Sequence, residues 1–230
     1  MRHRGPHPED EELFAPSTWP ELQAATAELS WLLSRGYARK SALKLVGDHH
    51  QLRERQRIAV SRCTCSEQER AARLSRQCTR LASRLWIDGF NLLTTLEAAL
   101  AGGFILAAQD GCYRDMASLH GTYRRVDETA QAVVLVGEFT GPTEAHWLFD
   151  QPVSNSGRLA ALVRELADQR GWPWTVELVP DPDPLLADCA AMIASADSAI
   201  LDRAAAWFNL ARAIVDARIP TARIVPLDMA

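Results

Sequence analysis

Short apolar segments alternate with helical segments from residue 85 to the end of the chain, and this alternation constrains the fold more than any other feature. Strands that alternate with helices pair in parallel within an open sheet, and the helices cover its faces. The sequence therefore predicts an α/β domain over residues 85–230 with a mainly parallel sheet. The expected strands are Leu85–Ile87, Phe104–Ala108, His146–Phe149, Thr175–Val179, Met192–Ala194 and Arg223–Pro226.

Residues 19–84 form a second unit, which the spacing of apolar residues predicts to be a small, all-helical module. Within it, residues 35–84 carry 13 basic and 4 acidic side chains, and most of the basic ones are arginines. The last predicted helix, Ser66–Ser83, repeats arginine every three or four residues, which would form a cationic stripe along one flank. A basic module beside an acidic domain is typical of polyanion binding, and arginines that pair with the acidic domain explain it equally well.

Six arginines are the expected contacts to a nucleic-acid backbone. Five of them lie in the helical module, and the sixth follows a Ser-Asn-Ser-Gly turn at the predicted start of a helix, where exposed amides favour phosphate. They are Arg53, Arg57, Arg73, Arg76, Arg80 and Arg158.

The N-terminal residues and the cysteines bear on localisation. Residues 1–18 contain three prolines and the acidic run Glu9–Glu12, which predicts a disordered leader, and they lack the apolar core of a secretory signal. The longest uncharged apolar stretch has 11 residues, whereas a membrane span needs roughly 20. The five cysteines have no regular spacing and fit free thiols better than a disulfide framework. We therefore expect a cytoplasmic protein that does not bind membranes.

Aspartates end four of the apolar segments. They are Asp88 in RLWID, Asp110 in FILAAQD, Asp150 in HWLFD and Asp197 in AMIASAD. Ligands of an open parallel sheet bind beyond the carboxyl ends of its strands, so these side chains are expected at the crevice. Several carboxylates that crowd together need a cation, and ligands that are all oxygens suit Mg²⁺ or Mn²⁺. For any single aspartate, capping of the next helix is the simpler explanation.

The residues Asp88-Gly89-Phe90-Asn91, directly after an apolar strand, carry a resemblance to a known family. This motif resembles the first-strand signature of PIN-like nucleases of the NYN branch, and Met192–Ser198 is similar to a later strand of that branch. The resemblance implies a PIN/NYN-like, Rossmannoid fold in which Asp88 and Asp197 bind metal and Asn91 secures the first loop. It also implies that Asp188, on a helix before the last catalytic strand, completes the metal site.

A second resemblance covers most of residues 25–215. WLLSRGYARKSALKLVGDHHQLRERQRIAVSR, WIDGFNLLTTLEAALAGG, DGCYRDM, PVSNSG and ASADSAILDR are similar to the family that pairs two domains of unknown function. The 434 type is N-terminal in that family and the 5616 type is C-terminal. This resemblance implies the two-part organisation and no activity.

These features together favour a divalent-metal-dependent nuclease that hydrolyses phosphodiester bonds, with RNA favoured over DNA. Asp88, Asn91 and Asp197 form its expected catalytic group, and water is the expected nucleophile because no Ser, Cys or His is arranged to act as one. The alternative is a non-catalytic scaffold of nuclease-like fold that binds RNA or a protein. Ser198 favours that alternative, because many NYN relatives have a second acid at this place.

Overall fold

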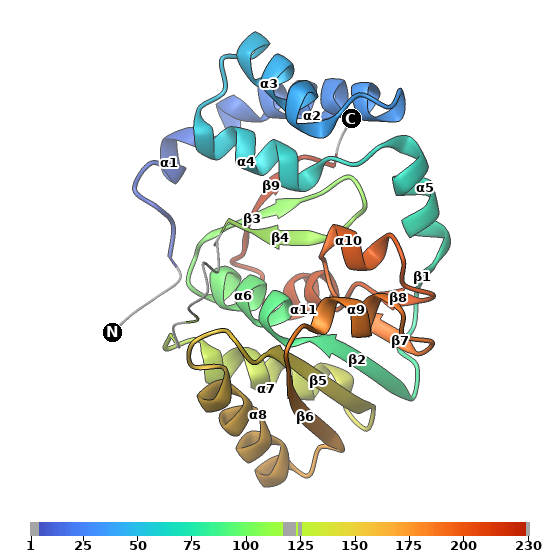
Figure 1. Cartoon of the computed structure of the whole chain (residues 1–230). Coiled ribbons are helices and arrows are strands. Elements are labelled where there is room, and N and C mark those ends of the chain that lie inside the picture. The colour runs from blue at the N-terminus through green and yellow to red at the C-terminus, as the bar shows by residue number, and fades with distance from the viewer. Residues whose placement is uncertain (1–4, 117–122, 124–125, 229–230) are drawn as a thin grey trace.

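Six parallel strands form the larger of two sheets in this computed structural model, which describes residues 5–116, 123 and 126–228 (Figure 1). In spatial order they are β1 (Gln77–Cys78), β8 (Trp207–Phe208), β7 (Met192–Ala194), β2 (Arg84–Asp88), β5 (Glu144–Asp150) and β6 (Trp174–Val179). Every neighbouring pair in this sheet is parallel. The predicted α/β fold with a mainly parallel sheet is therefore confirmed.

Side chains alternate between the two faces of the sheet, and each face buries a separate apolar core. Leu85 and Ile87 on β2 pack into the larger core, whereas Leu148 on β5 and Ile193 on β7 pack into a smaller one. The larger core is covered by α6 (Gly89–Leu100), α7 (Thr129–Thr140), α8 (Ser156–Arg170) and α11 (Leu210–Arg218). The smaller is covered by α9 (Pro182–Ala187) and α10 (Ser198–Leu201).

Two of the expected strands belong to a second, three-stranded sheet. In spatial order this sheet contains β4 (Tyr113–Asp115), β3 (Phe104–Ala107) and β9 (Arg223–Pro226). β3 pairs antiparallel with β4 and parallel with β9. Ile105 contributes to the larger core of the main sheet, whereas Phe104 and Leu106 face the helical module. The second sheet therefore joins the two parts of the chain.

The helical module comprises α2 (Trp19–Ser34), α3 (Arg39–His49), α4 (Glu54–Cys63) and α5 (Glu67–Ser75). A capping box begins α5, because Ser66 and Glu69 each accept the other's backbone N–H. The helix ends eight residues before the predicted Ser83, and the chain continues directly into β1. The expectation of a helix through Ser83 is wrong, because the backbone groups of Gln77 and Cys78 pair with β8 instead of continuing the helix. No helix in the described ranges is long and apolar enough to cross a membrane.

Part of the predicted disordered leader is folded. Residues 10–18 form α1 (Asp10–Leu13) and a 3₁₀ turn, η1 (Pro16–Thr18). Phe14 is completely buried and packs against Phe104, with the ring centroids 5.6 Å apart. The buried carboxylate of Asp10 pairs with Arg55 at 2.7 Å. The acidic, proline-rich composition suggested disorder, but these contacts with the core outweigh it.

The burial of Phe14 makes a measurable prediction. Phe14→Leu keeps an apolar side chain but loses the ring contact with Phe104. We expect it to lower the free energy of unfolding by about 1 kcal/mol, which chemical denaturation of the full chain would measure. The exposed, neighbouring Glu12→Gln serves as the control, with no change expected beyond that of a weak surface ion pair. Equal stability of the Phe14 variant and the parent would show that the segment adds nothing to the fold.

Candidate functional site

The order of the strands creates a crevice between β2 and β7. The chain proceeds from β2 to β5 and β6 on one side, and then returns to place β7 and β8 on the other. Neighbouring connections therefore diverge between β2 and β7, at the carboxyl ends of these two strands (Figure 1). Such a switch point is where open α/β sheets bind their ligands. Asp88 ends β2, and Ser195 directly follows β7.

The Asp-Gly-Phe-Asn motif ties the ends of these two strands together. Asp88 is 7% exposed and accepts hydrogen bonds from Ser195 Oγ at 2.8 Å and from the Asn91 backbone N–H at 3.3 Å. The side chain of Asn91 accepts the backbone N–H of Ala196 at 2.8 Å. A Cβ atom at Gly89 would lie 2.3 Å from the ring of Phe149, so only glycine fits there. The motif thus fixes the crevice geometry.

Asp197 lies on the other side of the crevice. Its carboxylate caps α10 by accepting the backbone N–H groups of Ala199 at 2.7 Å and Ile200 at 3.3 Å. Its own backbone N–H donates to Ser195 Oγ at 3.0 Å, while that hydroxyl donates to Asp88. Ser195 therefore links the two aspartates. The capping explanation considered for single aspartates holds for Asp197, and the same residue also faces the crevice.

Further carboxylates lie near Asp88, and we call the set Asp88, Asp150, Asp181, Asp183 and Asp197 the acidic edge. Burial raises the pKa of Asp88 to about 7, and the charges of Asp183 and Asp197 add to the increase. Burial also raises the pKa of Asp183, with contributions from Asp197, Asp181 and Asp150. The pKa of Asp150 is raised by burial and by Asp181. Like charges thus converge on this edge of the sheet.

Two of the predicted metal ligands lie elsewhere. Asp110 follows β3 in the second sheet, where its buried carboxylate receives hydrogen bonds from Arg114 at 2.9 and 2.7 Å and from Arg73 at 2.7 Å. These arginines hold the pKa of Asp110 well below its usual range, although burial opposes them. Asp188 is exposed and pairs with Arg203. The buried Asp110 is therefore enclosed by arginines, and Asp188 does not join the carboxylates near Asp88.

The remaining carboxylates fit a hard divalent ion only in part. Their donors are all oxygens, which suits Mg²⁺ or Mn²⁺. Within the described ranges, however, no three of the acidic-edge carboxylates bring ligand atoms within 4.8 Å of one another. Mg²⁺ commonly uses one or two carboxylates and completes its shell with water and substrate phosphates. Asp88 and Asp197, linked through Ser195, are therefore the pair best placed to hold such an ion.

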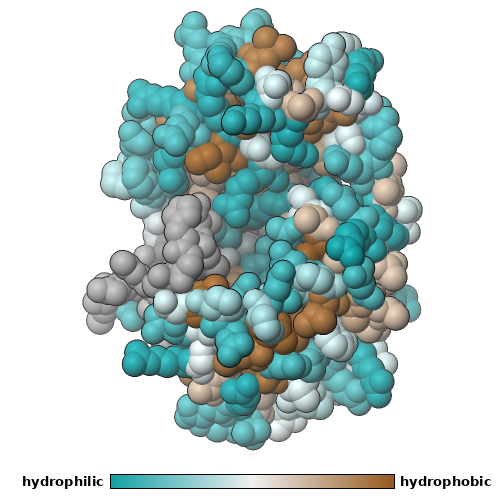
Figure 2. Space-filling view, viewed as in Figure 1, coloured by the Kyte–Doolittle hydropathy of each residue, from teal (hydrophilic) through white to brown (hydrophobic). Residues whose placement is uncertain are grey.

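A polar cavity of about 370 Å³ is lined by Asp197 of this pair, whereas Asp88 is not among its lining residues. It separates the helical module from α6 and α10, and Figure 2 shows a hydrophilic hollow between the two parts of the molecule. Asn91 and Asp197 line one wall. The charged lining residues balance in number, with Arg39, Arg62, Arg73 and Arg114 against Glu69, Asp115, Asp197 and Asp202. The formal charges of these lining side chains therefore cancel.

Most of the predicted nucleic-acid contacts bind the protein itself. Arg73 has a side chain only 2% exposed and pairs with Asp110 and Asp202. Arg57 donates to the backbone oxygens of residues 47 and 52, and Arg76 to those of residues 72, 202 and 204. Arg53 pairs with Glu12 on the surface. The expected cationic stripe on α5 does not form. Most of these arginines instead pair with groups of the protein itself, which was the other explanation of the basic module.

The other two predicted arginines are exposed and lie apart. Arg80 lies between β1 and β2, beyond the end of α5, and Arg158 lies in the first turn of α8. Neither lines the cleft. The sequence analysis did not predict Arg39 and Arg62 at the cleft, because their place depends on how α3 and α4 pack. Asp183 was not predicted either, because it lies at the start of α9 and does not end an apolar segment.

The fold and the site define an α/β protein with an acidic switch point and an N-terminal helical module built into the same core. Residues 21–76 match the family model "Protein of unknown function (DUF434)", and residues 79–213 match "Domain of unknown function (DUF5616)". The chain belongs to the family that pairs these two domains, as the sequence motifs predicted.

A protein of Methanocaldococcus jannaschii, "Uncharacterized protein MJ0935", is a relative of this chain. The two are 31% identical over 149 residues, which make up 63% of this chain and 72% of the relative. No solved structure matches the chain. The family and the relative carry no stated activity, so function has to be argued from the site.

Proposed function

We propose that the chain is a divalent-metal-dependent nuclease of PIN/NYN-like fold, which hydrolyses phosphodiester bonds of RNA in preference to DNA. One observation carries this proposal: carboxylates from the neighbouring strands β2 and β5, from the start of α9 and from the loop after β7 gather at one switch point. Isolated carboxylates in such proximity repel one another, and a cation relieves the repulsion. The crevice is also where this class of sheet binds substrates.

Two residues of the chain would bind the ion, and two others would fix the geometry of the crevice. Asp88 and Asp197 would hold Mg²⁺ or Mn²⁺, which supplies an activated water molecule and neutralises charge on the phosphate. Ser195 keeps the Asp88 carboxylate in place through its 2.8 Å hydrogen bond. Asn91 fixes the loop after β7 through the Ala196 N–H, so that Asp197 is presented toward the cleft.

The cleft offers a route for the backbone of a nucleic acid toward the acidic edge. Arg62 lies in the last turn of α4 and is one of the residues that line the cavity. Arg39 also lines the cleft but donates to the backbone oxygens of Ser61 and Thr64, and therefore also supports the module. Phosphate binding is thus expected to depend on Arg62 and on the divalent ion together.

Cleavage of mixed single-stranded RNA by the purified full chain tests the proposal. Products are expected with Mg²⁺ or Mn²⁺ and not with EDTA, and single-stranded DNA of matched length should be cleaved more slowly. A parent protein that cleaves neither substrate with either ion would contradict the proposed activity.

Arg62 provides a separate test of the cleft. Arg62→Ala should weaken the binding of single-stranded RNA about tenfold at low salt, because a lost hydrogen bond to a charged phosphate is worth about 1.5 kcal/mol. Fluorescence anisotropy with Mn²⁺ would measure the change. The matched control is Arg70→Ala on α5, an exposed arginine that does not line the cleft. Equal weakening by both variants would point to diffuse attraction instead of a binding cleft.

A specific observation favours the second candidate, a non-catalytic scaffold that binds RNA or protein. Among the described residues the acidic edge lacks a ready three-ligand cluster, and Ser198 stands where a further acid would strengthen it. Metal binding separates the two candidates, because a ligand that binds only the folded state raises the melting temperature. A nuclease should be stabilised by Mn²⁺ through Asp88, so that Asp88→Asn reduces the rise in melting temperature, whereas the response of a scaffold to Mn²⁺ should not depend on Asp88.

The proposed setting is the cytoplasm. All five cysteines are free thiols, and three of them are buried. Burial raises the pKa of Cys63 to about 12 and that of Cys65 to about 11, so both remain protonated and inert as nucleophiles. Unpaired thiols of this kind are typical of proteins kept in a reducing compartment.

A further inference from the structure

Two adjacent histidines at the end of α3 face two glutamates on α2. His50 Nε2 lies 2.9 Å from Glu28 Oε2, and its Nδ1 contacts Glu21 Oε1. Donor atoms of Glu28, His49 and His50 all lie within 4.8 Å of one another. Among the described residues, no other group of three His, Cys, Asp or Glu side chains has its ligand atoms within 4.8 Å of one another. None of its members belongs to the acidic edge.

We propose that Glu28, His49 and His50 bind a divalent transition-metal ion of the Zn²⁺ class. Imidazole and carboxylate ligands suit this class, and three protein ligands leave a fourth position for water. Tetrahedral Zn²⁺ with bonds of about 2.0 Å separates its ligand atoms by roughly 3.3 Å. The existing 2.9 Å separation between His50 and Glu28 therefore needs to open by only a few tenths of an ångström.

Glu21 supplies the support that a metal-binding histidine requires. Such a histidine usually donates its other ring N–H to a carboxylate, which fixes the ring and its tautomer. Glu21 contacts Nδ1 of His50 and leaves Nε2 directed at Glu28. The His50 side chain is only 7% exposed, so packing also restrains the ring. The ion would replace the proton shared between Nε2 and Glu28, and that proton would pass to water.

His49 distinguishes a metal site from a simple ion pair between His50 and the glutamates. The ion pair is formed by His50, Glu21 and Glu28, and His49 takes no part in it. In the described structure His49 makes an edge contact with the His50 ring, at 4.8 Å between centroids, and no hydrogen bond or ion pair is recorded for it. A metal ion would use its imidazole as the third ligand.

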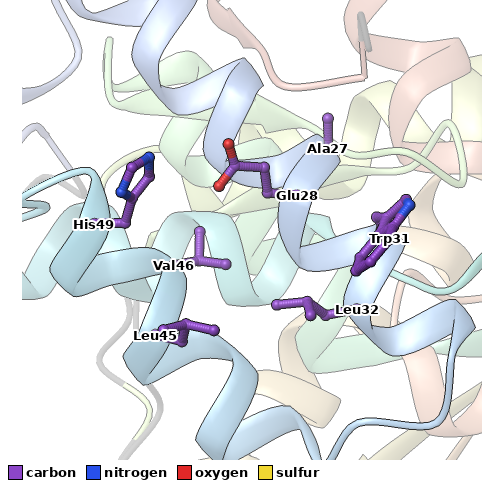
Figure 3. A pocket seen from close by; sticks show the side chains of 7 residues that line it. All are labelled: Ala27, Glu28, Trp31, Leu32, Leu45, Val46 and His49. Atoms are coloured by element: carbon purple, nitrogen blue, oxygen red, sulfur yellow. The ribbon is translucent and has the colours of Figure 1, made fainter.

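The site is accessible from an open pocket of about 660 Å³ between α2 and α3. Figure 3 shows Glu28 and His49 on one side of this pocket and Trp31 on the other, with Val46, Leu32 and Leu45 below them. Because Glu28 and His49 line the pocket, an ion bound there would be within reach of solvent and of small ligands. This position lies on the helical module, apart from the proposed nuclease site.

Titration of the full chain with Co²⁺ and Zn²⁺ tests the site. With excess Mg²⁺ present to occupy the acidic edge, calorimetry should give one saturable Zn²⁺ site, and Co²⁺ should give ligand-field absorption bands without the intense sulfur-to-cobalt bands that cysteine ligands produce. His49→Ala and Glu28→Gln should each weaken Zn²⁺ binding by more than about 100-fold, and Glu21→Gln by about tenfold. His49→Ala should leave the melting temperature of the metal-free protein unchanged, which separates loss of a ligand from loss of fold.

Glu144→Gln is the matched control, because it removes an exposed carboxylate that belongs neither to this cluster nor to the acidic edge, and it should leave Zn²⁺ affinity unchanged. The proposal is overturned if the parent shows no saturable Zn²⁺ binding, or if His49→Ala binds as tightly as the parent. It is also overturned if the cobalt complex shows sulfur ligation. Each of these outcomes is independent of whether the chain cleaves RNA.

Discussion

Asp88→Asn should abolish metal-dependent RNA cleavage while the chain remains folded. Loss of groups that merely orient a metal ligand lowers metal affinity or activity by about 10- to 100-fold, so loss of a ligand should exceed about 100-fold. Asparagine retains the size of the side chain and one oxygen that can accept the Ser195 hydrogen bond. Initial rates at saturating Mn²⁺, together with circular dichroism, would measure both parts of the expectation.

Asp88→Asn should at the same time make the metal-free fold more stable near neutral pH. The pKa of Asp88 is raised to about 7 in the folded chain, against an ordinary value of 3.8. A raised pKa in the folded state stabilises the fold at pH values below the unfolded value, and that stability is lost as the pH rises toward 7. Asparagine does not ionise, so without divalent ions the variant should become increasingly more stable than the parent between pH 4 and 7. The difference is at most about 4 kcal/mol.

Asp188→Asn is the control for cleavage. The sequence analysis grouped Asp188 with Asp88, but the structure places it on the surface in a pair with Arg203. It should therefore retain parental activity. If Asp88→Asn cleaves RNA at the parental rate, or if Asp188→Asn is equally defective, the acidic edge as defined is not the active site.

Asp110→Asn should strongly destabilise the fold, although Asp110 lies outside the acidic edge. Its carboxylate lies between the buried guanidinium groups of Arg73 and Arg114. Removing one partner from a buried ionic cluster leaves charge without compensation and typically lowers the free energy of unfolding by about 3–5 kcal/mol. For a chain of this size, the melting temperature should fall by roughly 10 °C. Thermal denaturation at neutral pH would measure the change.

The pH dependence of this effect follows from the lowered pKa of Asp110. A depressed pKa in the folded state contributes stability above the unfolded value, near pH 4, and this contribution is lost as the pH falls further. Parent and variant should therefore differ fully at neutral pH and converge in strong acid. Glu144→Gln, which removes an exposed pair with Arg84, should change stability by less than about 1 kcal/mol. Equal effects of the two substitutions would contradict the structural role of Asp110.

Apolar periodicity predicted the main architecture because it reports directly on burial. β7 and β9 have the bounds expected from the sequence. Very short elements such as β1 and β8 were missed, because two residues carry no period and their pairing depends on distant contacts. The assignment of Phe104 to a separate sheet likewise depends on its packing against the helical module, which local sequence does not encode.

The candidate site was predictable where a motif fixed its geometry. Asp88, Asn91 and Asp197 belong to quoted motifs and meet at the same crevice. Asp110 ends an apolar segment in the same way, yet it belongs to the other sheet and binds two arginines. Its neighbours Arg73 and Arg114 are 41 positions apart, so a pattern read along the chain could not distinguish a metal ligand from an ion-pair partner.

The contact between α5 and β8 also affects how the chain matures during translation. The indole N–H of Trp207 donates to the backbone oxygen of Arg73, 134 positions earlier. At roughly 5–20 residues per second, a ribosome needs on the order of 10 s to synthesise the stretch between them. During that interval Asp202 has also not been made, so Asp110 is the only one of the two carboxylate partners of Arg73 described above that is present. The first-synthesised helices can therefore reach their final packing only when the last quarter of the polypeptide emerges.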